Sequence, residues 1–157
     1  MLALVQDIVL TQLSVAGGRF NVVLLAVVAW GLLRGPAESM IWAFIGGLML
    51  DLFSGGPLGG ITLALLIVAF LASRQWGSEL GSVHVQLILL GLILSFLYHI
   101  LLLIILSWRG YPVNWAYSLP QVAAPSAALN AVLAPFIYRP LAWLDRRTRP
   151  EGLTFDA

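Results

Sequence analysis

The apolar segment over residues 83–107 constrains the fold most, because it contains no Asp, Glu, Lys or Arg. A helix of about 20 such residues crosses the hydrocarbon core of a bilayer. The rest of the chain agrees, since 61% of its 157 residues are hydrophobic, only 10% are charged, and the mean hydropathy is +0.97. Soluble domains carry about a quarter charged residues. The sequence therefore predicts an all-α integral membrane protein.

Six apolar runs follow one another, bounded by charges, Gly, Pro or aromatic clusters. They cover residues 2–15, 20–33, 39–53, 58–72, 83–107 and 122–144. The first four are short and reach spanning length only with their flanks, or cross as tilted or partly re-entrant helices. We expect one six-helix transmembrane bundle over residues 1–147 and a short cytoplasmic tail over residues 148–157. The first run is either a short helix packed in the bundle or a span truncated by a misplaced translation start.

The basic residues, all of them Arg, predict the orientation of this bundle. With both chain ends in the cytoplasm, only Arg19 and Arg109 lie outside. Six lie inside: Arg34, Arg74, Arg139, Arg146, Arg147 and Arg149. The positive-inside rule then places the C-terminus in the cytoplasm. The last three of these arginines lie where anionic headgroups attract them, so a specific lipid or protein site there is an alternative to a topology signal alone.

Asp51 is the most unusual polar residue, because it ends an apolar run and precedes a glycine-rich stretch in GGLMLDLFSGGPLGG, residues 46–60. A carboxylate costs about 2.5–3.5 kcal/mol at the bilayer centre and less towards its edges. The negative end of a helix dipole also disfavours it. An arginine from another span, backbone donors of the glycine loop, or protonation would offset these costs. Asp51 is therefore either a water-exposed helix end or a fixed part of a site, and the crowding glycines favour the site.

Small residues around Asp51 recur at a spacing of four, as Ala43 with Gly47 and as Gly55 with Gly59. This spacing lets helix backbones approach closely in lipid. Glycines 55 and 56 can also end a helix in the left-handed conformation, with a proline blocking its continuation. The stretch SGGPLGG is thus expected to be a tight turn between two closely packed spans.

Four aromatic residues cluster in the longest predicted connection, residues 107–120, at the outer boundary. They are Trp108, Tyr111, Trp115 and Tyr117. Amphipathic rings favour the headgroup level, which makes an interfacial belt the simpler reading. Aromatics also anchor protein interfaces, so a partner contact is the alternative.

The remaining polar residues do not form a pattern typical of chemistry. His84 and His99 are too far apart to share a ligand, and neither has a metal-binding partner at a suitable spacing. Asn130 is expected to make a hydrogen bond between helices, and Pro125 and Pro135 to kink the last span. Cysteine is absent, and no catalytic constellation or basic nucleic-acid stripe occurs. We expect no metal, no cofactor, no nucleic-acid partner and no catalytic residue.

Two blocks resemble the rod shape-determining MreD family: RFNVVLLAVVAWGLLRG (19–35) and FIGGLMLDLFSGGPLGG (44–60). The closing PSAALNAVLAPFIYRPLAWLDRR (125–147) is similar to that family's last helix, including Asn130. The matching positions in the first two blocks are Arg34, Gly35, Gly47, Asp51, Gly56, Pro57, Leu58 and Gly59. The family usually has Pro-Asp before the second span, where this chain has Phe20 and Asn21.

The resemblance implies a bundle similar to the substrate-binding membrane subunits of energy-coupling-factor transporters. It also implies a non-enzymatic scaffold of the cell-elongation machinery in the bacterial inner membrane, which helps organise peptidoglycan synthesis. The implied partners are MreC above all, RodA with its partner transpeptidase, and MreB indirectly. In this interpretation Gly47, Asp51 and the turn over residues 55–60 fix the packing of spans three and four and so shape a surface for MreC.

Two alternatives remain at the level of sequence. A vitamin-type binding subunit of a transporter would need a pocket where polar groups converge, and its candidates are Asp51, His99, Asn114 and Asn130. An intramembrane enzyme would need Asp51 within hydrogen-bond reach of His99 or Asn130.

Overall fold

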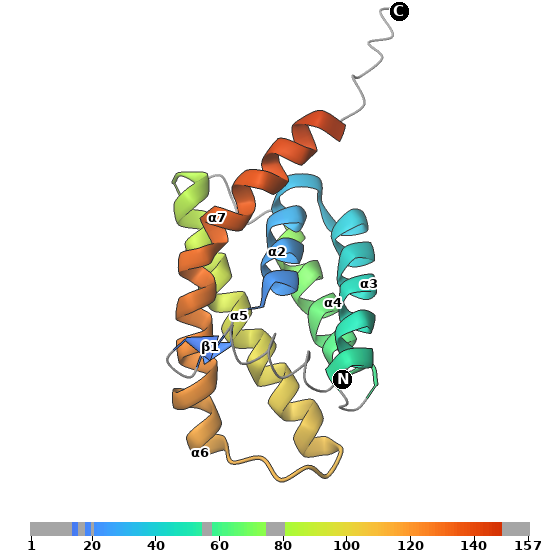
Figure 1. The fold of residues 1–157 in the computed structure, drawn as a ribbon, viewed down its shortest axis with the longest axis vertical. Coiled ribbons are helices and arrows are strands. Elements are labelled where there is room, and N and C mark those ends of the chain that lie inside the picture. The colour runs from blue at the N-terminus through green and yellow to red at the C-terminus, as the bar shows by residue number, and fades with distance from the viewer. Residues whose placement is uncertain (1–13, 16–17, 20, 55–57, 75–80, 149–157) are drawn as a thin grey trace, which may run out of the picture.

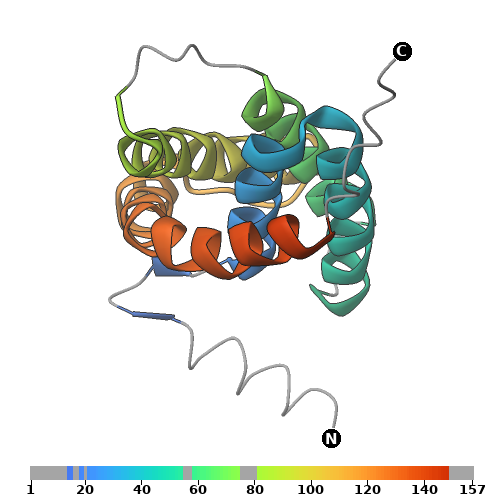
Figure 2. The same cartoon turned by 90° about the horizontal axis from the view of Figure 1, so that it is seen from above.

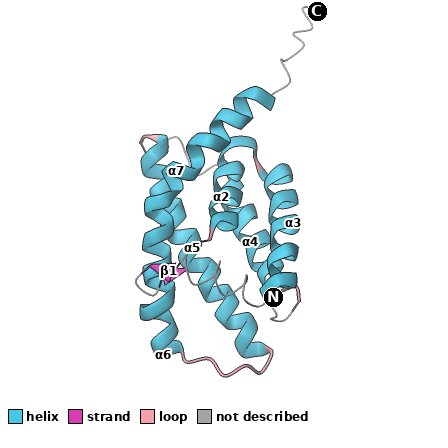
Figure 3. Ribbon diagram, viewed as in Figure 1, coloured by secondary structure: helices cyan, strands magenta, loops and turns pink. Residues whose placement is uncertain are grey.

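The computed structural model describes residues 14–15, 18–19, 21–54, 58–74 and 81–148, and in these residues the fold is a helical bundle (Figures 1 and 3). The helices are α2 (Val22–Arg34), α3 (Pro36–Ser54), α4 (Gly60–Ser73), α5 (Val83–Trp108), α6 (Trp115–Ser118), the π-helix η1 (Leu119–Ala123) and α7 (Ala124–Thr148). Two-residue strands β1 (Ser14–Val15) and β2 (Gly18–Arg19) pair antiparallel. Successive long helices run in opposite directions (Figure 1).

Three helical segments of the described chain are long and apolar enough to cross a membrane: Pro36–Ser54, Val83–Trp108 and Trp115–Thr148. Helices α2 and α4 are apolar but shorter. The predicted spans over residues 20–33, 39–53, 58–72 and 83–107 each correspond to one helix within a few residues. Most of the first predicted span lies outside the described residues. Its last two residues form β1, so the expectation of helix up to Val15 is wrong.

Helix α2 lies at the centre of the bundle and contacts α3, α4, α5 and α7. It begins where the Asn21 side chain accepts a hydrogen bond from the Leu24 backbone N–H at 3.0 Å, a typical N-cap. It ends at Gly35, whose φ of 91° lets the chain turn directly into α3. Most α2 side chains are buried, including Leu24, Val27 and Val28 in the main apolar core with residues of α4 and α5.

Helix α3 lies at the edge of the bundle (Figure 1) and buries only a narrow stripe. Its buried residues are Ser39, Ala43, Gly47 and Asp51, each four positions after the last. Residues at this spacing share one face of a helix, and three of the four are small. The opposite surface exposes large apolar side chains: Met40, Ile41, Trp42, Phe44, Ile45, Leu48, Met49, Leu52 and Phe53.

The last helical segment is longer than the sequence predicts. We expected a connection over residues 107–120, but the chain is already helical from Trp115, and α6, η1 and α7 form one continuous segment to Thr148. The loop prediction is therefore wrong in its second half. The π-helix η1 immediately precedes α7, whose second residue is Pro125, and Pro135 and Pro140 lie within α7. The carboxyl-terminal part of α7 turns across the end of α2 (Figures 1 and 2), and prolines are the usual cause of such a bend.

Candidate functional site

Asp51 is a buried side chain that joins α3 to α4. Only 2% of its surface is exposed, so it is not the water-exposed helix end that the sequence left open. Its Oδ1 accepts a hydrogen bond from the backbone N–H of Ile61 at 2.9 Å. Its Oδ2 accepts from the backbone N–H groups of Gly59 and Thr62, both at 3.0 Å, and from the Thr62 hydroxyl. The carboxylate therefore has four donors, all from the start of the next helix.

These donors explain how an acid is held at the negative end of its own helix. The first backbone N–H groups of any helix lack partners within that helix and carry the positive end of its dipole. In α4 the residue at the N-cap position, Gly59, contributes no side-chain hydrogen bond. The Asp51 carboxylate of α3 accepts these hydrogen bonds instead and so caps α4. Among the described residues no arginine pairs with Asp51.

Gly47 brings the two helix backbones together one turn before Asp51. A Cβ atom on Gly47 would lie 2.6 Å from the Cα atom of Thr62, which is closer than real Cβ contacts. Only glycine fits without moving α3 from α4. Gly59 has a φ of 90°, which glycine adopts without strain. The other predicted turn residues, Gly55, Gly56 and Pro57, lie outside the described residues.

At the opposite end of α3, Arg34 links three helices. Its guanidinium donates to the Asp145 carboxylate of α7 at 2.5 Å and to the Thr148 hydroxyl at 2.6 Å. It also pairs with Glu38 of α3 at 3.4 Å and lies 5.3 Å from the centre of the Trp30 ring. The carboxyl-terminal part of α7 bends across the end of α2 (Figure 1). The network depends on this bend, because Asp145 lies on that part of α7 and bonds to Arg34.

Asn130 makes a third set of polar contacts, in the interior of the bundle. Its side-chain amide donates to the Ser95 hydroxyl of α5 at 2.6 Å, and its oxygen accepts from the Asn21 backbone N–H at 3.2 Å. Asn130 thus connects α7 with α5 and with the start of α2. Gly91 permits the close approach of α5 and α7, since a Cβ there would lie 3.3 Å from the Cβ of Ala134.

The polar candidates for a ligand pocket do not all converge, since His99 and Asn130 both contact Ser95 whereas Asp51 and Asn114 have other partners. His99 Nδ1 lies 2.7 Å from the Ser95 carbonyl oxygen, Asn114 caps α6, and the hydrogen bonds of Asp51 within the described chain go to α4 and its preceding residue. A cavity of about 200 Å³ lies beside Asp51, but its lining is mostly apolar. No group of three metal-ligating side chains occurs among the described residues. The hydrogen bonds of Asp51 and Asn130 support a role in helix packing at these two positions.

The four aromatic residues of the predicted outer boundary are all exposed and lie at or near the junction of α5 and α6. Trp108 ends α5 and is 90% exposed, and Tyr111, Trp115 and Tyr117 are at least one-third exposed. They lie at the end of the bundle away from Arg34 (Figure 1). This position is compatible with both an interfacial belt and a partner contact.

The sequence did not identify several partners in these contacts. Thr62 follows the glycine turn by a few residues, and its place in the first turn of the next helix was a usable signal. Asp145 and Ser95 had no such signal, since their partners Arg34 and Asn130 are remote in sequence. Buried side-chain polar atoms without a partner are absent from the described residues, so the polar interior is fully hydrogen-bonded.

Apolar helices of spanning length, joined by buried polar contacts, define a membrane-embedded helical-bundle protein. The sequence matches the family model of rod shape-determining protein MreD over residues 1–143. The chain therefore belongs to the MreD family, whose role is in determining rod shape. Searches of curated proteins and of solved structures found no match. The six-helix count and the similarity to energy-coupling-factor subunits stay predictions.

Proposed function

We propose that this protein is a non-enzymatic scaffold of the cell-elongation machinery that binds MreC and helps organise peptidoglycan synthesis. The family match supports the general role in rod shape. The observation that carries the scaffold assignment is the use of Asp51, a buried carboxylate, as a cap on a neighbouring helix. A carboxylate that accepts hydrogen bonds from four donors is fixed in place, which suits it to a structural role.

The charges at the two ends of the bundle support a specific orientation. One end carries Arg34, Arg74, Arg139, Arg146 and Arg147, whereas Arg109 follows α5 at the other end. By the positive-inside rule, the first end faces the cytoplasm when the protein lies in the bacterial inner membrane. The carboxyl end of α7 then lies on the side of MreB, and the aromatic residues at the end of α5 and beyond it face the periplasm.

The docking surface in this proposal is the outer face of α3. Because α3 buries a single stripe, its position depends on Gly47 and Asp51, which set its distance and rotation relative to α4. The large apolar residues on its outer face are exposed, although Trp42 also packs edge-on against Trp30 of α2, and in this proposal the face receives a membrane-embedded helix of MreC. RodA and its partner transpeptidase would join through the same assembly.

The test is affinity purification of the tagged protein in mild detergent, with Asp51→Asn compared with wild type. Replacing the carboxylate removes the charge and places an amide N–H₂ against N–H donors, which should shift α3 and reduce recovery of MreC and RodA. Cells that depend on the variant should lose rod shape. Glu38→Gln is the comparison variant, because Glu38 is a partly exposed acid at the other end of α3 whose partners Arg34 and Trp30 lie on α2 rather than on α4.

Normal rod shape and normal MreC recovery with Asp51→Asn would contradict the role assigned to Asp51. Recovery of a transporter ATPase instead of MreC from wild type would contradict the scaffold assignment itself.

A further inference from the structure

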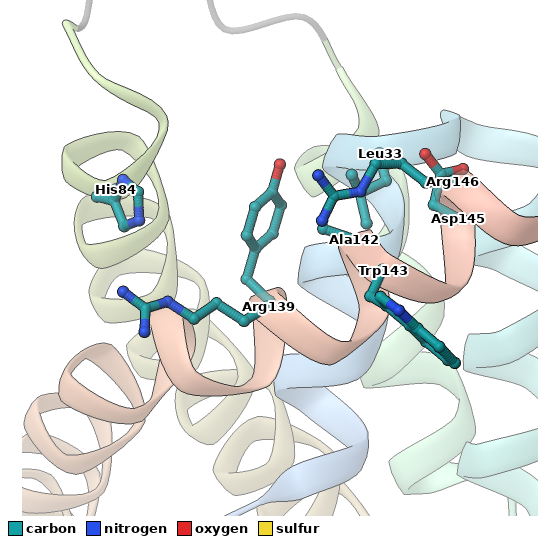
Figure 4. A pocket seen from close by; sticks show the side chains of 8 residues that line it. Leu33, His84, Arg139, Ala142, Trp143, Asp145 and Arg146 are labelled. Carbon is teal, nitrogen blue, oxygen red and sulfur yellow. The ribbon is translucent and has the colours of Figure 1, made fainter.

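A cleft opens at the arginine-rich end of the bundle, between the first turn of α5 and the bent part of α7. It has a volume of about 740 Å³, and its lining includes His84 from α5 and Tyr138, Arg139, Trp143 and Arg146 from α7. Figure 4 shows Arg139 extending from α7 towards His84, with Arg146 further along the same helix. Arg139 and Arg146 are seven residues apart, so they lie on one face of α7, about 10 Å from each other.

The charge of this cleft is positive. Neither Arg139 nor Arg146 forms an ion pair with a carboxylate in the part of the chain that the structure describes. The one acid in the lining, Asp145, is buried and pairs with Arg34 of α2. Its charge is thus compensated, and the two guanidinium groups remain available to an anion. Arginine is well suited to phosphate because its planar group can donate two parallel hydrogen bonds.

An apolar strip on the same helix leads to the cleft. Phe136 and Val132 are exposed one and two turns before Arg139, respectively, at positions that share its face of α7. Trp143, which is half exposed, lies one turn beyond. Indole rings favour the boundary between hydrocarbon and headgroups. The surface of α7 therefore changes from apolar to cationic at headgroup level. A phospholipid changes in the same direction, from an apolar acyl chain to a charged phosphate.

From this arrangement we propose that the cleft binds the phosphate of an anionic phospholipid, with Arg139 and Arg146 on the phosphate and an acyl chain along Val132 and Phe136. Basic pockets between helices on the cytoplasmic side are known to take such headgroups. The shared chemistry is a phosphate group, and the apolar strip is what distinguishes a lipid from free phosphate as its source. The site is separate from the Asp51 contact, so it does not depend on the scaffold proposal.

The experiment is thermal unfolding of the purified protein in detergent with added phosphatidylglycerol, since a ligand of the native state raises the melting temperature. Phosphatidylcholine and inorganic phosphate are the comparison ligands. The test variant is the double change Arg139→Gln and Arg146→Gln. The control is Arg147→Gln. Arg147 neighbours the site, but it does not line the cleft, and its Cζ atom lies 4.5 Å from the centre of the Trp143 ring.

Phosphatidylglycerol should stabilise wild type and Arg147→Gln alike. The double variant should bind it about thirtyfold more weakly, as expected for two lost charge contacts. All variants should melt at similar temperatures without lipid, because both side chains are exposed. If Arg147→Gln weakened phosphatidylglycerol binding equally, binding would reflect the general positive charge of this surface, and the proposal of a specific site would be wrong. Equal stabilisation by phosphatidylcholine would contradict the requirement for an anionic headgroup. Stabilisation by inorganic phosphate alone would contradict the proposal that the bound phosphate belongs to a lipid.

Discussion

The two ends of α3 are held by different kinds of contact. Near its carboxyl end Asp51 is fully buried, and its partners are backbone and hydroxyl donors within eleven residues of it in sequence. Near its amino end Glu38 joins a partly exposed network centred on Arg34, whose main partner is Asp145 of α7. One end is therefore a local, buried cap, and the other is a long-range ion pair whose Arg34 side chain keeps partial access to solvent while Asp145 is buried.

This difference indicates which forces hold each end of α3. A buried cap is set by close packing and hydrogen-bond geometry, so steric changes should disturb it most and salt should have little effect. An ion pair with partial access to solvent depends on charge and is screened by salt. The three predictions below test this contrast, beginning with the largest expected effect.

Gly47→Ala should destabilise the protein by about 2 kcal/mol, because its new methyl group would meet the Thr62 backbone and force α3 away from α4. The measurement is the free energy of unfolding from SDS titration in mixed micelles, followed by helical circular dichroism. Gly91→Ala is the control, since its Cβ would lie 3.3 Å from the Ala134 Cβ and no closer than 3.4 Å to the backbone of Ala131. A smaller loss for Gly47→Ala than for Gly91→Ala would contradict the tight α3–α4 contact.

Asp145→Asn should have a smaller effect than Gly47→Ala, and that effect should depend on salt. The change keeps the shape of the side chain but removes the charge that faces Arg34. The stability difference from wild type should therefore shrink as salt rises to about 1 M, where the Debye length is about 3 Å. The same titration at low and high salt measures it. A difference that does not change with salt would show that shape, not charge, holds this end.

Thr62→Val should give the smallest effect, a loss of about 1 kcal/mol, as expected for one hydrogen bond to Asp51. The substitution keeps the side-chain volume and the Thr62 backbone donor. Its effect should be equal at low and high salt, in contrast to Asp145→Asn. A salt-dependent loss would mean that the Asp51 cap also relies on a long-range charge.

The contrast between the ends also explains what the sequence could predict. The Asp51 contact is formed by neighbours along the chain. Backbone donors of the glycine loop were one of the three ways to offset the cost of Asp51 that the sequence left open, and the small-residue spacing predicted close packing around Gly47. Helices α2 to α5 were predictable from apolar length, whereas the strand β1 and the helical start at Trp115 were not. Pro120 favoured a loop there, yet the irregular hydrogen bonding of η1 accommodates it within a continuous helix.

The Arg34 network was not predictable, because nothing near Arg34 in sequence indicates Asp145. That pair exists only because α7 bends across α2, and the bend depends on how the prolines pack in the assembled bundle. For the same reason Arg139 and Arg146 suggested an orientation in the membrane, whereas the cleft that they line with His84 required the fold.

The continuous segment from Trp115 to Thr148 has a mechanical consequence. Its 34 residues correspond to about 50 Å of helix, well beyond the roughly 30 Å of a hydrocarbon core. A single helix thus begins beside the aromatic residues at one end and finishes in the arginine-rich network at the other. Because the segment is bent near its prolines, a displacement of its start reaches Asp145 and the cleft walls only through that bend. The aromatic end of the bundle and its arginine-rich end are thus joined by one covalent element.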